Sequence, residues 1–92
     1  MTLWYARHPD LRVTALQGEG LALHLGARRY FTVSETGLDL LEALEVPRTF
    51  ETLVTTLTTR YSVDQARAAQ SVREFLNRCM DSGLIVTEER PE

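Results

Sequence analysis

The hydrophobic periodicity of this chain changes once, where Arg28–Val33 runs into Ser34-Glu35-Thr36-Gly37. Before this junction, apolar and polar residues alternate, which is the period of a half-buried strand. After it, apolar residues recur every three or four positions, which is the period of an amphipathic helix. This order of patterns predicts an α+β domain in which a small sheet is followed by helices.

Three alternating segments precede the junction: Leu11–Leu16, Leu21–Leu25 and Arg29–Val33. Glycine-containing turns at 17–20 and 26–28 separate them, and glycine tolerates the backbone conformations that tight turns need. Short connections of this kind join antiparallel neighbours. We therefore predict a three-stranded antiparallel sheet, with residues 1–10 as an extended lead-in.

Three helices are predicted after the sheet, the first two with a capping residue at the start, and each with a stop signal at its end. The starts are marked by Ser34 or Thr36, by Thr49 and by Asp64, and the ends by Pro47, by Arg60-Tyr61 and by Ser82-Gly83. A sheet followed by helices in this order predicts a winged-helix-like fold.

The third helix has an apolar arc that covers about half of its circumference, wider than the stripe of a helix with one packed face. Two interpretations stay open. Either the helix is buried on two sides, or part of the arc around Ala68, Ser71 and Phe75 forms the lip of an exposed groove.

The length of 92 residues allows one domain, with a core of about 11–86 and a charged tail, 87–92, that we expect to be disordered. No signal peptide or membrane-length apolar run is visible, so we expect a cytoplasmic protein with no membrane partner. The net charge of −3 argues against nucleic acid as a partner. All ten basic residues are arginine, which suits bidentate recognition of carboxylates.

Catalytic and metal-binding arrangements are not evident. Cys79 is the single cysteine and lies on the apolar arc, where a buried hydrophobic role is expected. His8 and His24 lack companions for a metal site. Acidic residues recur along the first helix and predict its solvated face; they are Glu35, Asp39, Glu42 and Glu45. We expect no enzyme activity, no cofactor and no metal.

Three segments together resemble PqqD-like proteins. Phe31–Gly37 resembles their strand-to-helix junction, Arg48–Val54 the capped start of their second helix, and Ser71–Leu76 followed by Gly83–Val86 their last helix and its exit. The resemblance spans roughly residues 11–86. Two positions depart from it, because Ser34 and Ser71 stand where that family often has Asn and Asp.

The resemblance implies a recognition element for ribosomally made precursor peptides, most similar to the stand-alone proteins of lasso-peptide clusters. Such a domain binds the precursor's leader peptide, which in lasso systems carries a Tyr-x-x-Pro motif, as a strand added to the third strand. It presents the leader to a separate, transglutaminase-like cysteine-protease subunit, and a cyclase is a second candidate partner. The residues expected to bind the peptide here are Arg28, Arg29, Tyr30, Phe31, Thr32, Val33, Arg67, Ala68, Ser71, Val72, Phe75 and Arg78.

Two other functions stay open at this stage. A winged-helix regulator would bind DNA, but its recognition helix should present basic or amide residues along one face, and here acidic residues accompany the arginines. A structural adaptor would pair through the free edge of the sheet as a homodimer. We expect Phe75→Ala to weaken leader binding while the domain stays folded.

Overall fold

A computed structural model describes residues 1–91, and the last residue, Glu92, lies outside the described part. The elements are β1 (Thr2–Arg7), β2 (Leu11–Leu16), β3 (Glu19–His24), β4 (Arg29–Ser34), α1 (Glu35–Ala43), β5 (Arg48–Thr49), α2 (Phe50–Arg60), α3 (Gln65–Asp81) and β6 (Ile85–Arg90). The predicted antiparallel meander followed by three helices is confirmed as β2-β3-β4 and α1 to α3.

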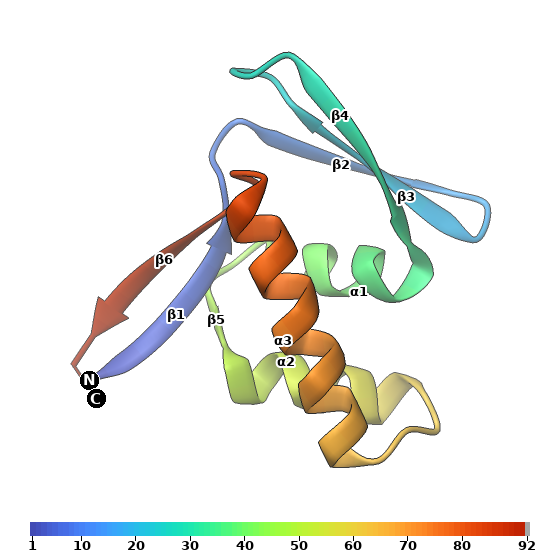
Figure 1. Cartoon of the computed structure of the whole chain (residues 1–92), viewed down its shortest axis with the longest axis vertical. Coiled ribbons are helices and arrows are strands. Elements are labelled where there is room, and N and C mark those ends of the chain that lie inside the picture. Colours follow the sequence, from blue (N-terminus) through green and yellow to red (C-terminus); the bar gives the residue numbers. More distant parts are fainter. Residues whose placement is uncertain (92) are drawn as a thin grey trace.

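A second sheet, which the sequence analysis did not predict, has the order β5-β1-β6. Its strands are antiparallel, and β1 pairs along its whole length with β6, from Thr2 opposite Arg90 to Arg7 opposite Ile85. The expected lead-in is therefore mostly strand. The expectation of a disordered tail is wrong for residues 87–90, which pair in β6 although their side chains are charged and mostly exposed. The start of β1 and the end of β6 therefore lie side by side (Figure 1).

The helices lie beside and between the two sheets, with α1 against the meander and α3 running from the region of α2 toward the junction of the sheets (Figure 1). The five largest fully buried side chains all come from the helical region and its loops; they are Leu40, Leu41, Leu44, Leu53 and Val72. Burying a side chain of this size contributes about 1.5–3 kcal/mol. The helical apolar stripes therefore supply most of the core. None of the helices in residues 1–91 is long and apolar enough to cross a membrane.

The inner face of β3 carries its smallest residues. Gly20 and Ala22 are buried, whereas Leu23 is 38% exposed on the opposite face. A Cβ atom at Gly20 would lie 2.7 Å from the Leu38 Cδ1 of α1 and 2.9 Å from the Val33 Cγ2 of β4. The face of β3 with the small residues is therefore the buried one, because α1 packs too closely for larger side chains. The more hydrophobic Leu23 remains on the exposed face.

Asp39 corrects the prediction that the acidic residues of α1 all face solvent, because it is only 7% exposed. The Tyr61 hydroxyl donates a short hydrogen bond to the Asp39 carboxylate. The Arg60 guanidinium lies 3.6 Å from the other carboxylate oxygen. The hydrogen bond to Asp39 raises the pKa of the Tyr61 hydroxyl above its ordinary value. Buried carboxylates need such partners, so these contacts tie the end of α2 to α1.

Candidate functional site

The edge of the meander is formed by β4, which pairs with β3 on one side and has no strand on the other among the described residues. Phe31 and Val33 turn toward the helices and are half-buried, while Tyr30 and Thr32 face outward and are exposed. The predicted division of the strand into two faces is confirmed. An edge strand offers unpaired backbone N–H and C=O groups to an added strand.

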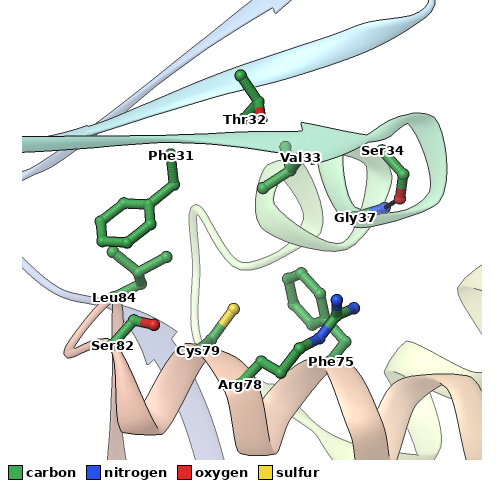
Figure 2. Close-up of a pocket in the computed structure, with 10 residues that line it drawn as sticks. All are labelled: Phe31, Thr32, Val33, Ser34, Gly37, Phe75, Arg78, Cys79, Ser82 and Leu84. Carbon is green, nitrogen blue, oxygen red and sulfur yellow. Dashed lines mark hydrogen bonds between the residues drawn. The ribbon is translucent and has the colours of Figure 1, made fainter.

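A groove of about 240 Å³ lies between β4 and the C-terminal end of α3 (Figure 2). Its lining residues are Phe31, Thr32, Val33, Ser34, Gly37, Phe75, Arg78, Cys79, Ser82 and Leu84. The strand contributes Phe31 and Val33 from one side, and the helix contributes Phe75 and Cys79 from the other. The groove is therefore apolar inside, directly beside an open strand edge.

The strand side of the groove is fixed by the start of α1. Ser34 is the N-cap of α1, and its hydroxyl oxygen accepts a hydrogen bond of 3.2 Å from the Gly37 amide. A Cβ atom at Gly37 would lie 3.3 Å from both the Val33 Cβ and the Phe75 Cε1. Glycine at this position allows strand, helix start and aromatic ring to meet closely.

The helix side of the groove is fixed by the end of α3. Gly83 adopts a φ of 72°, and its amide and the Leu84 amide donate to the carbonyls of Met80 and Cys79. This is the hydrogen-bond pattern of a Schellman motif, which confirms the predicted helix stop. The reversal places Leu84 at the end of the groove, opposite Phe31 (Figure 2).

Arg78 is the one charged residue among those that line the groove. Its side chain is exposed and rises from α3, with the guanidinium at the level of the Phe75 ring (Figure 2). Cys79 is 4% exposed, and burial raises the pKa of its thiol to about 11, while the positive charge of Arg78 acts in the opposite direction. The thiol is thus neutral at physiological pH, which is the opposite of an activated nucleophile.

Five of the predicted peptide-binding residues line the groove: Phe31, Thr32, Val33, Phe75 and Arg78. The predicted lip at Ala68, Ser71 and Phe75 is placed too early in α3. Ala68 and Val72 have no exposed surface, lie in the core and do not line this groove, so their part in peptide binding stays a prediction. The reason is that α3 borders the groove only with its last two turns, which contain Phe75, Arg78 and Cys79.

The remaining predicted residues lie outside the groove lining. Arg67 is in the first turn of α3 and is exposed. Arg28 has a φ of 56° in the turn before β4. The Arg29 guanidinium lies 5.2 Å from the centre of the Phe31 ring, a cation–π contact near the strand's start. The exposed Tyr30 is on the outer face of the sheet. Their part in peptide binding stays a prediction.

Sequence reasoning missed five lining residues: Ser34, Gly37, Cys79, Ser82 and Leu84. One signal was present, because Cys79 follows Phe75 by four positions and so shares its helix face. The others join the groove through the helix reversal and the α1 cap, which place residues from separate elements together. Among residues 1–91, no group of three or more histidine, cysteine or acidic side chains could hold a metal ion. His8 and His24 do meet, with ring centres 4.5 Å apart.

The chain is similar to known proteins in sequence and in structure. The family model of coenzyme PQQ synthesis protein D (PqqD) matches residues 19–85. A solved structure described as TbiB1 in complex with the TbiA(beta) leader peptide has a TM-score of 0.79 at 23% identity, covering 95% of this chain and 99% of that one. A lasso peptide synthetase B1 complexed with the leader peptide has a TM-score of 0.76 at 15% identity, covering 89% and 96%. No curated protein matches the chain. Both structures show a shared fold.

Proposed function

This chain belongs to the PqqD family, and from that premise we propose that it binds the leader segment of a ribosomally made precursor peptide without catalysing a reaction. The bound leader adds a strand to the free edge of β4 and inserts alternate side chains into the groove. The observation that carries the proposal is the position of the groove, directly beneath an unpaired strand edge. The two structural neighbours are both complexes with leader peptides.

Strand addition accounts for both affinity and selectivity. Backbone hydrogen bonds to β4 contribute about 1 kcal/mol each and are independent of the peptide's sequence. Selectivity comes from side chains that point into the groove, where Phe31, Phe75 and Leu84 offer apolar contact. A bound peptide would thus need an apolar anchor at the position that faces Phe31.

We further propose that the domain delivers the bound leader to the enzymes that process the precursor. The domain holds the leader for a separate cysteine-protease subunit of the transglutaminase type, and in the same pathway for a cyclase, with the core peptide left free for processing. Its groove contains a neutral, buried thiol and no neighbouring base, which fits a binding role.

The test is a titration, followed by fluorescence anisotropy, with a fluorescein-labelled peptide. The peptide carries the leader sequence of the short precursor encoded beside the gene for this chain. Phe31→Ala should weaken binding about 10- to 100-fold, the range for a central apolar anchor. Leu16→Ala is the matched control, because Leu16 is an exposed apolar residue on β2, the opposite edge strand of the same sheet.

Salt concentration separates peptide capture from DNA binding. Strand addition with an apolar anchor should change little between 50 and 200 mM salt, whereas affinity for a DNA duplex should fall about 10³-fold or more over that range if 6–10 phosphates are contacted. Absence of leader binding, or equal loss in both variants, would contradict the proposed function.

A further inference from the structure

The groove is cationic although the chain as a whole is acidic. The net charge is −3, yet the ten residues that line the groove include the guanidinium of Arg78 and no carboxylate. Binding of an apolar side chain in the groove does not require this charge. A cation beside an apolar site is a recognition feature when its counter-ion is supplied by the ligand.

Arg78 has no acidic partner in the part of the chain that the structure describes. The ion pairs found among residues 1–91 are Arg60–Asp39 and Arg90–Glu88. Glu74 precedes Arg78 by four positions on α3, a spacing and order that favour an ion pair on a helix surface. That pair is not among the ion pairs found, and the Arg78 guanidinium instead lies at the level of the Phe75 ring (Figure 2). Arg29, by comparison, is engaged with the Phe31 ring.

The two ends of the groove differ in character. Phe31 and Leu84 lie together at one end, and Phe75 and Arg78 lie toward the other, beneath Val33 (Figure 2). In an added strand, every second side chain faces the groove, at intervals of about 6.8 Å. When one peptide side chain packs against Phe31 and Leu84, the side chain two residues away therefore faces the end with Arg78.

We propose that Arg78 determines specificity by pairing with a carboxylate of the bound strand, two residues from the apolar side chain that packs against Phe31 and Leu84. This proposal rests on the proposed function. Arg78 is exposed, so its guanidinium is accessible to a ligand, and its paired N–H donors match an Asp or Glu carboxylate. The partner chemistry is thus an extended peptide with an apolar and an acidic residue at alternate positions.

The experiment selects random 12-residue peptides, displayed on phage, against immobilised wild-type protein, Arg78→Glu and Arg73→Glu. Arg73→Glu is the matched control: it makes the same charge change on the same helix, but its guanidinium lies 5.5 Å from the Phe50 ring, outside the groove. Circular dichroism checks that each variant is folded. Protection of the Cys79 thiol from alkylation shows which selected peptides occupy the groove.

Wild type and Arg73→Glu should select an apolar residue with Asp or Glu two positions away, and Arg78→Glu should select Lys or Arg at that second position. In synthetic peptides, changing the acidic residue to its amide should weaken wild-type binding about 5- to 10-fold, as for a charge-assisted hydrogen bond at a partly exposed site. Arg78→Gln should remove this difference.

Groove-binding peptides without acidic enrichment, or the same consensus for Arg78→Glu as for wild type, would overturn the role of Arg78 and leave the proposed function standing. If no selected peptide protects Cys79 in any variant, the groove does not bind peptides, and both proposals fail together.

Discussion

Alkylation of Cys79, the single thiol of the chain, reports directly on the groove. The thiol is 4% exposed, and burial raises its pKa from the ordinary value of 9.0 to about 11. At pH 8 this change of two units leaves about 100-fold fewer thiolates than in an unperturbed cysteine. A thiolate of higher pKa is a better nucleophile by about 6- to 10-fold over this range, so the net slowing from the pKa alone is about 10- to 15-fold.

The assay measures the rate of iodoacetamide labelling by mass spectrometry, with the urea-unfolded chain as the reference. We expect at least a 10-fold slower reaction in the folded protein, and a further slowing in proportion to occupancy when a groove-binding peptide is added. Arg78→Gln should slow labelling of the free protein, because the Arg78 charge lowers the thiol pKa. Labelling at the rate of the unfolded chain would refute the burial of this thiol and its place in the groove.

The same raised pKa fixes the sign of a pH effect on stability. The thiol ionises near pH 9 in the unfolded chain and near pH 11 in the folded one. The contribution of Cys79 to the free energy of unfolding is therefore fully present below pH 9. It is lost as the pH rises through 11, since the unfolded state then releases its proton first. Urea unfolding followed by circular dichroism should therefore show stability falling across this interval, and falling less in Cys79→Ala.

Three further substitutions test the packing that positions the groove. Tyr61→Phe removes the hydrogen bond to the buried Asp39 and should lower the free energy of unfolding by about 1–2 kcal/mol in urea titrations at pH 7. A decrease smaller than the experimental error would show that this hydrogen bond does not stabilise the fold. Gly20→Ala places a Cβ 2.7 Å from Leu38 Cδ1 and should cost about 1–3 kcal/mol through overpacking. Gly83→Ala meets no atom within 4 Å but retains a φ of 72°, and should cost about 1 kcal/mol from backbone strain alone. Asn should be tolerated better than Ala at Gly83 and worse than Ala at Gly20; the same order at both sites would contradict this distinction.

The structure argues against the expectation that Phe75→Ala leaves the domain folded. Phe75 is only 5% exposed and belongs to the core as well as to the groove. Removing a buried phenylalanine costs about 3–5 kcal/mol, a large part of the stability of a small domain. Phe31, which is half-buried on the strand, is the better position for separating binding from folding.

Local signals were sufficient for the meander and the helices. Alternation in β2 and β4, the caps at Ser34, Thr49 and Asp64, and glycine at the end of α3 each depend on residues within one element. Hydrogen bonds to a cap or a turn involve neighbours in sequence, so the sequence alone contains that information. The second sheet could not be predicted in this way. Its main pairing joins the first and last strands, and β6 is charged and has no alternating pattern.

The candidate site also has features that the sequence predicts and features that depend on packing between elements. The sequence by itself determined that β4 has an apolar and a polar face, that α3 has an unusually wide apolar arc, and that no catalytic grouping is apparent. Only the tertiary structure decided where strand and helix meet, which placed the groove at Phe75, Arg78 and Cys79 and left Ala68 and Val72 in the core. The reason is physical: the period of an element fixes which side chains share a face, whereas packing between elements fixes which part of that face is covered.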